Sequence, residues 1–192
     1  TFSRDLADLI SAGGMTAVSA GIEIATSTGL DCVNKGTDIE NIIFACCAFK
    51  EAGILIHSYM IFGFWNQTEQ DLINSMETLR QMFEAGLIDS AFWHKFTLTK
   101  HSTVYEEYKR GKYPKLKIFQ QSDEQFAKND LHFEGEKKSE KYSLPLNVAL
   151  ENWMHLNKFE KPVETYFPFK MPRPTISKEF VRTVIQKYEK KQ

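Results

Sequence analysis

The pattern of apolar and polar residues alternates between two periods over the first hundred positions. Segments with an apolar residue every three or four positions, the spacing of amphipathic helices, cover residues 3–12, 37–52 and 68–86. Strand-like apolar runs follow them at residues 18–24, 54–62 and 89–99. Helices and strands that alternate at this spacing are typical of βα units, and right-handed crossovers make their sheet parallel. The sequence therefore predicts an α/β fold with three parallel strands.

The start of each predicted helix carries a residue suited to capping. Ser3 precedes the first helix, and Thr37, with Glu40 three residues later, has the spacing of a capping box. Thr68, with Asp71 three residues later, begins the third helix in the same way. These caps fix where each predicted helix begins.

After residue 101 the pattern changes. Residues 104–141 are charged and lack a sustained period, so we expect an irregular excursion with at most short helices and assign it no function. Helices are predicted again over 143–157 and 175–190. We therefore divide the chain into a first part, residues 1–110, and a mostly helical C-terminal extension, residues 111–192.

Composition and charge exclude several classes of partner. The formal net charge is −1, and no cluster of basic residues offers a surface for nucleic acid or anionic lipid. No apolar run approaches the roughly 20 residues that cross a bilayer, and no signal peptide is visible, so we expect a cytoplasmic protein without a membrane partner. Three cysteines are too few for a disulfide framework and should be free thiols.

Polar residues fall on particular faces of the first two predicted strands. Alternation places Glu23 on a face that otherwise carries small residues. On the second strand His57 and Tyr59 share a face with Ile61. These faces are the first candidates for a site.

Three stretches, read together, resemble successive pieces of a barrel of the radical S-adenosylmethionine (radical SAM) superfamily. They are GIEIATSTGLDCVNKGTDIENI, AFKEAGILIHSYMIFGFWNQTEQD and FWHKFTLTKHSTVYEEY. The matching positions are Gly21, Ile22, Glu23, Lys35, Gly36, Thr37, Ile61, Gly63, Thr68, Glu69 and Asp71. The resemblance covers about the first 110 residues. Within this superfamily, the chain resembles the proteins often described as iron–sulfur oxidoreductases, many of which also carry a cobalamin-binding domain.

The resemblance implies half of a TIM-like barrel, with the three predicted strands as the fourth, fifth and sixth of six. The family's C-x-x-x-C-x-x-C motif, which ligates a [4Fe-4S] cluster, is absent, and Cys32, Cys46 and Cys47 do not have its spacing. Residues 65–67, Trp-Asn-Gln, stand where the family has Pro-Gly-Glu. Because the family's cluster loop follows its first strand, we expect the missing N-terminal half of the barrel to lie upstream of Thr1.

The resemblance also assigns roles in SAM binding. Glu23 would bind the ammonium or ribose hydroxyls of SAM and Lys35 its carboxylate, while Ile61 and Gly63 would meet the adenine and Tyr59 would point into the lumen beside them. Each residue also has a structural interpretation. Glu23 could pair with a nearby lysine, Lys35 could be a solvated turn residue, and Ile61 and Gly63 could be a buried strand ending in a turn.

A substrate pocket is expected on the inner side of the barrel. His57 would line it, although a lone strand histidine is more often a hydrogen-bonded structural group. On the third strand we expect the face of Phe92 to pack outward against helices, which leaves Lys95 and Thr97 as the inner residues. No residue of the chain is expected to bind a metal.

Three functions fit these observations. The leading hypothesis is a fragment of a radical SAM enzyme that, when intact, cleaves SAM reductively to start radical chemistry on an unknown substrate. A non-catalytic binding or scaffold domain that kept the fold is the alternative, and an unrelated α/β binding module is a third. A half barrel exposes a sheet edge, so we also expect self-association through that edge.

Overall fold

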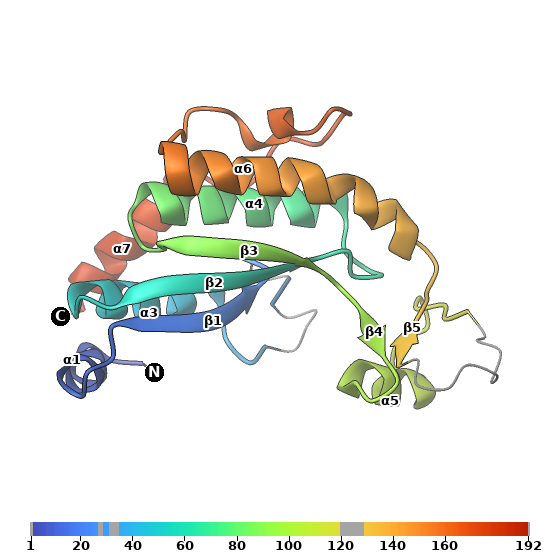
Figure 1. The fold of residues 1–192 in the computed structure, drawn as a ribbon, viewed down its shortest axis with the longest axis horizontal. Helices are drawn as coiled ribbons and strands as arrows, with labels where there is room; N and C mark the ends of the chain where they lie inside the picture. Colours follow the sequence, from blue (N-terminus) through green and yellow to red (C-terminus); the bar gives the residue numbers. More distant parts are fainter. Residues whose placement is uncertain (1, 27–28, 31–34, 120–128, 192) are drawn as a thin grey trace.

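The computed structural model describes residues 2–26, 29–30, 35–119 and 129–191. Its centre is a three-stranded parallel sheet in the order β1-β2-β3 (Figure 1). The strands are β1 (Ala17–Glu23), β2 (Leu55–Phe62) and β3 (Ser90–Lys95). The predicted α/β class and the three parallel strands are confirmed.

Helices cover one face of this sheet. The crossover helices are α3 (Ile39–Glu51) after β1 and α4 (Glu69–Glu84) after β2, and α6 (Ser143–Leu156) packs on β3. Two further helices lie against this layer, α1 (Arg4–Ala12) on α3 and α7 (Phe180–Glu189) on α3 and α4. The sheet therefore has helices from both the first and the second half of the chain on the same side.

The main core lies between the sheet and these helices. Met60 and Phe62 of β2, Trp93 of β3, Met76 of α4 and Trp153 of α6 are almost completely buried in it. Because alternate residues of a strand point to opposite faces, this core uses one residue in two along β2 and β3.

The helix caps match the sequence prediction in two of three places. Ser3 accepts a hydrogen bond from a backbone N–H of α1, and Thr68 forms a complete capping box with Asp71. The predicted Thr37 box is wrong, because Asp38 is the N-cap of α3 and its carboxylate accepts the N–H of Asn41. Aspartate is at least as good an N-cap as threonine, so the helix begins one residue later than predicted.

The third predicted strand, 89–99, is divided in two. β3 ends at Lys95, and the chain turns away to form β4 (Leu98–Thr99), which pairs antiparallel with β5 (Asp130–Leu131). The two parts of this run belong to two different cores, and both cores need apolar residues. The sequence pattern is therefore apolar throughout and does not show where one strand ends and the next begins.

A small lobe therefore stands beyond the carboxyl ends of the strands (Figure 1). It contains β4, β5, α5 (Thr103–Lys109) and an isolated bridge between Ile118 and Phe133. Its own core consists of Leu98, Leu116, Leu131 and Phe133. This lobe is an insertion between β3 and α6, at the end of a parallel sheet where binding loops gather in α/β proteins.

Packing does not follow the predicted division at residue 110. The main core includes residues of α6 and α7, such as Leu150 and Val184, while the core of the small lobe uses residues from both sides of position 110. The other C-terminal elements are the 3-10 helices η1 (Glu136–Tyr142) and η2 (Val163–Tyr166). The last helix begins at Phe180, five residues later than predicted.

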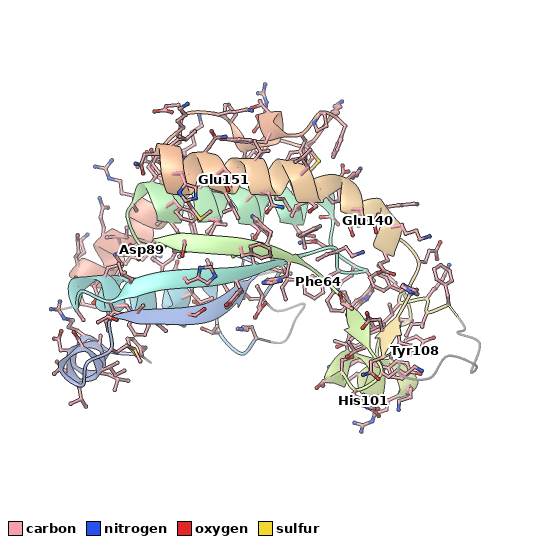
Figure 2. The ribbon with its side chains drawn as sticks, viewed as in Figure 1. Phe64, Asp89, His101, Tyr108, Glu140 and Glu151 are labelled. Atoms are coloured by element: carbon pink, nitrogen blue, oxygen red, sulfur yellow. The ribbon has the colours of Figure 1, made fainter. Side chains whose placement is uncertain are left out.

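Ion pairs join the two ends of β3 to neighbouring elements, and Figure 2 labels one carboxylate of each pair, Asp89 and Glu140. Asp89, just before the strand, accepts hydrogen bonds from Lys50 at 2.8 Å and from the N–H of Ile56 at 2.7 Å. At the carboxyl end, Lys95 lies 3.2 Å from Glu140 of η1. The helix η1 is thus tied to the end of the strand that precedes the small lobe.

Candidate functional site on the open face of the sheet

The face of the sheet opposite α3, α4 and α6 is exposed or half-buried, and we call it the open face. The strand register places its side chains in rows across β1, β2 and β3. It consists of Ala17, Ser19, Gly21, Leu55, His57, Tyr59, Ile61, Ser90, Phe92 and His94. Three of the predicted site residues, His57, Tyr59 and Ile61, lie on it, and Glu23 and Lys35 reach over it.

An exposed face is notable on a parallel sheet. Parallel sheets occur almost entirely in α/β proteins in which both faces are covered. Here Tyr59 is 40% exposed and Phe92 48% exposed, although both are large rings in the middle of their strands. β1 and β3 are also the two outer strands of this sheet, so self-association through an edge stays a prediction.

Four rings lie close together on this face. The ring centroids of Tyr59 and His57 are 4.8 Å apart, those of Tyr59 and His94 5.4 Å, and those of Phe92 and His94 4.6 Å. His57 Nδ1 also lies 2.7 Å from the hydroxyl of Ser90. That bond matches the structural interpretation of His57 and leaves its Nε2 as the other polar atom of the ring.

Glu23 and Lys35 meet at the carboxyl end of β1. Lys35 Nζ donates to Glu23 Oε1 at 3.0 Å, and their side chains are 34% and 22% exposed, respectively. Glu23 has a φ of 66°, and the register of β1 shifts between Gly21 and Glu23. Left-handed backbone at a non-glycine residue costs of order 1–3 kcal/mol and is concentrated at functional sites.

Gly21 allows this pair to lie over the open face. A Cβ atom built on Gly21 would stand 2.0 Å from Glu23 Oε1 and 3.4 Å from Lys35 Nζ. The Glu23 carboxylate therefore occupies the space that a side chain at position 21 would fill. Because Gly21 is paired with Tyr59 in the register, the ion pair lies beside the rings of the open face.

Gly63 lies just beyond β2, in the turn before α4. It has a φ of 87°, its N–H donates to Gln67 Oε1 at 2.7 Å, and a Cβ there would stand 2.7 Å from the hydroxyl oxygen of Ser139. Glycine is needed for both reasons. Ile61, two residues earlier, is half-buried on the open face.

The predicted faces of the third strand are reversed. Ala91 and Trp93 are buried, and Ala91 contacts Met154 of α6, whereas Phe92 and His94 lie on the open face. The strand carries large rings on both faces, so size alone did not identify the buried one. The sequence carried one indication of the correct face: the residue two positions from Phe92 is the polar His94, whereas Trp93 shares its face with the apolar Ala91.

The two candidate residues predicted on the third strand, Lys95 and Thr97, do not lie on the open face. Lys95 is paired with Phe62, a residue of the helix-covered side, and its ammonium contacts Glu136 and Glu140. Thr97 is exposed in the link between β3 and β4. The expectation that Lys95 is an inner residue is wrong, and a substrate role for Thr97 stays a prediction.

The two cysteines that the structure describes do not offer a cluster site. Cys46 and Cys47 are buried in α3, where burial raises the pKa of Cys46 to about 12 and that of Cys47 to about 11. Iron is bound by thiolates, which such pKa values disfavour. Cys32 lies outside the described residues. Across the part of the chain that the structure describes, no group of three or more His, Cys, Asp or Glu could hold a metal ion.

Comparison with known proteins gives no family. No protein-family model matches the sequence, and no curated protein matches it. Among the described residues, no helix has both the length and the apolar character to cross a membrane. A functional hypothesis must therefore rest on the open face and on the residues that meet there.

Proposed function

We propose that this chain is the later half of a radical SAM barrel, in which the open face lines the lumen and binds SAM. One observation carries the proposal. A parallel sheet with helices on one side presents an ion pair, Glu23 and Lys35, and a group of rings on the other, where a barrel encloses its ligands.

The ion pair fits the amino-acid part of SAM. That part carries an ammonium group and a carboxylate on one carbon, so it presents a positive and a negative charge together. Glu23 can accept hydrogen bonds from the ammonium group while Lys35 donates to the carboxylate. Both side chains are partly exposed, so exchanging one partner for the other requires no buried charge to be uncovered.

Neighbouring residues of the open face would position the rest of the cofactor. Tyr59 stands next to Gly21 in the register, and Ile61 follows two residues nearer to the carboxyl end of β2. Tyr59 offers a ring and a hydroxyl, and Ile61 an apolar surface against which an adenine can pack. His57 and His94 then remain for an unknown substrate; of these two histidines, only His57 was predicted from the sequence to line a substrate pocket.

The iron–sulfur cluster would have to be held by other residues. The two buried cysteines do not fit it, so its ligands belong to the N-terminal half of the barrel that the proposal requires. Together the cluster and SAM supply the one-electron chemistry. Residues of this chain would bind and orient SAM. A cobalamin-binding domain in the intact protein also stays a prediction.

The proposal is tested first on the parent protein. Its coding sequence should contain C-x-x-x-C-x-x-C some 80 to 120 residues before Thr1, roughly the length of three βα units. Reconstitution with iron and sulfide, followed by absorbance and a SAM-cleavage assay, should give a cluster and deoxyadenosine in the parent and not in this chain. No motif and no cluster in the parent would favour a non-catalytic scaffold domain instead.

Two matched variants then test the site. Lys35→Met in the reconstituted parent should weaken SAM binding at least tenfold, because the cofactor carboxylate loses its cation. Lys50→Met is the control, since Lys50 forms a similarly exposed ion pair with Asp89 at the other end of the sheet. Equal effects of the two variants would remove Lys35 from the site.

A further inference from the structure

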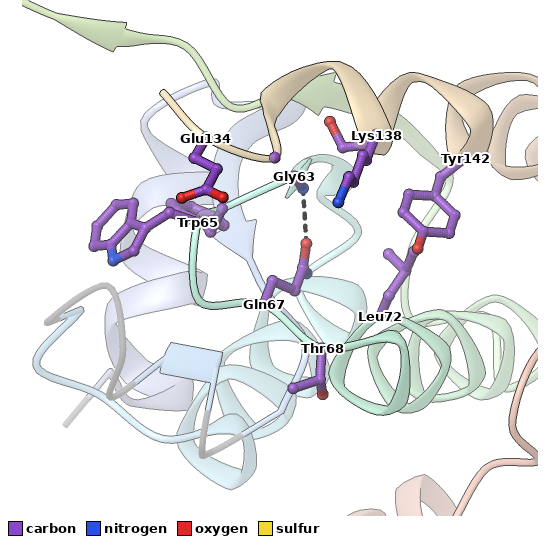
Figure 3. Close-up of a pocket in the computed structure, with 11 residues that line it drawn as sticks. Gly63, Trp65, Gln67, Thr68, Leu72, Glu134, Lys138 and Tyr142 are labelled. Carbon is purple, nitrogen blue, oxygen red and sulfur yellow. Dashed lines mark hydrogen bonds between the residues drawn. The ribbon is translucent and has the colours of Figure 1, made fainter. Parts of the chain in front are cut away.

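A cavity lies between the turn after β2 and the 3-10 helix η1 (Figure 3). Its volume is about 190 Å³, and Gly63, Trp65 and Gln67 of the turn face Lys138, Ser139 and Tyr142 of η1 across it. Since one water takes about 30 Å³ in the liquid, the space suits a molecule no larger than a single ring or a short chain.

Most polar groups of the cavity wall already have partners. The Thr68 hydroxyl donates to the Asp71 carboxylate at 2.6 Å, and the Tyr142 hydroxyl donates to Glu69 at 2.8 Å. The Ser139 hydroxyl donates to a backbone carbonyl at 2.7 Å. None of these hydroxyl protons is available to a bound molecule unless its present bond breaks.

Two donors remain. Because Gln67 Oε1 accepts the N–H of Gly63, the orientation of the amide is fixed and Nε2 is the atom left over. Nε2 is buried, and no residue that the structure describes forms a hydrogen bond with it. Lys138 directs its ammonium group toward the same space (Figure 3), and within the described parts of the chain no carboxylate pairs with it. The wall's own carboxylate, Glu134, pairs with Lys117 at 3.1 Å.

We propose that this cavity binds a small organic carboxylate. A ligand there meets one cation and one neutral donor; the ammonium group of Lys138 favours a negative charge, and a carboxylate has oxygens that can accept hydrogen bonds from both. Phe64, Trp65 and Leu72 supply apolar wall for the body of the molecule. The site is independent of SAM binding on the open face, because neither Gln67 nor Lys138 belongs to that face.

The fluorescence of Trp65, which lines the cavity, can report binding. The other two tryptophans, Trp93 and Trp153, are buried in the main core and do not line the cavity. Benzoate, titrated into this chain, should change the fluorescence of Trp65 with saturation. Calorimetry on the wild type should give the same affinity as the fluorescence titration, and the fluorescence change should disappear in Trp65→Phe.

Two further probes test separately whether binding needs the negative charge and whether it needs the apolar ring. Benzyl alcohol keeps the ring and removes the charge, and inorganic phosphate keeps the charge and removes the apolar body. Both should bind at least tenfold more weakly than benzoate. Benzyl alcohol that binds as tightly overturns the requirement for an anion, and phosphate that binds as tightly overturns the organic carboxylate in favour of any oxyanion.

Variants of the two donors complete the test. Gln67→Glu keeps the acceptor for Gly63 and replaces the Nε2 donor with a carboxylate oxygen, so benzoate should bind at least tenfold more weakly. Lys138→Met should have a similar effect, and Lys137→Met, the same change one residue earlier and outside this cavity, should stay within twofold. Unchanged affinity in both donor variants, with unfolding midpoints near the wild type, would overturn the proposal.

Discussion

The two faces of the central sheet differ although they belong to the same three strands. On β2, Met60 is fully buried against the helices, while its neighbour Tyr59 is 40% exposed. One face is explained by packing, because its side chains fill the main core. The open face is not, since rings, histidines and an ion pair there contribute little to burial. Stability and function are therefore expected to depend on opposite faces of one strand.

The largest difference should come from a pair of substitutions at adjacent positions of β2. Met60→Ala removes a buried side chain and leaves a cavity, which should lower the free energy of unfolding by about 2–5 kcal/mol. Tyr59→Ala removes a half-exposed ring and should cost less than about 1 kcal/mol. Urea unfolding measures both. Similar losses would mean that the open face is packed in solution, for instance in a self-associated form.

A second pair compares two glycines that share a left-handed backbone. Gly63→Ala combines a φ of 87° with a collision at Ser139, and should cost about 1–3 kcal/mol or more. Gly53→Ala has a φ of 74° and open space around its Cβ, so it should cost about 1 kcal/mol. Thermal or urea unfolding that gives equal losses would show that Ser139 moves away without cost.

The fold could be predicted from the sequence where the period of the chain was clear. The three parallel strands and the helices between them follow from alternation and from caps such as Thr68. The break of the third strand after Lys95 could not be predicted, because Leu98 continues the apolar run while it enters another core. The small lobe depends on contacts between residues far apart in the chain, such as Ile118 and Phe133, which no local pattern carries.

The candidate site was predicted in part. Glu23 and Lys35 were named separately from a resemblance, and the structure brings them together over Gly21. His94 was missed, because the faces of β3 were assigned from the size of Phe92 and not from the burial of its neighbours. Alternation gives two faces for any strand, and the choice between them depends on which side a helix covers.

A third prediction concerns alkaline pH and the covered side of the sheet. Burial raises the pKa of Cys46 from its ordinary value of 9.0 to about 12. The folded state therefore keeps the proton while the unfolded chain loses it, so the stabilisation is complete below pH 9 and declines as the pH rises toward 12. Between pH 9 and 10.5 the loss should reach up to about 2 kcal/mol. Urea unfolding of Cys46→Ala over this range should show a shallower decline than the wild type.

The corrected cap of α3 gives a smaller effect. Asp38→Ala removes the carboxylate that accepts the Asn41 N–H, and should lower the free energy of unfolding by about 1 kcal/mol. Thr37→Ala, the position that the sequence pattern favoured, should change it by less than about 0.5 kcal/mol. Urea unfolding of the two variants distinguishes the caps, and a larger loss at Thr37 would contradict the observed start of the helix.

The smallest expected effect on stability separates the two interpretations of Glu23. If the ion pair with Lys35 serves only the fold, the main consequence of removing it should be a loss of stability. A partly exposed pair contributes only about 0–1 kcal/mol to the free energy of unfolding. Glu23→Gln keeps the shape of the side chain and should therefore leave the unfolding midpoint nearly unchanged. In the reconstituted parent the same variant should weaken SAM binding at least tenfold, because the neutral amide no longer balances the cofactor's ammonium group. A variant that loses stability and keeps its affinity for SAM would identify the pair as structural, and the open face would then need another ligand.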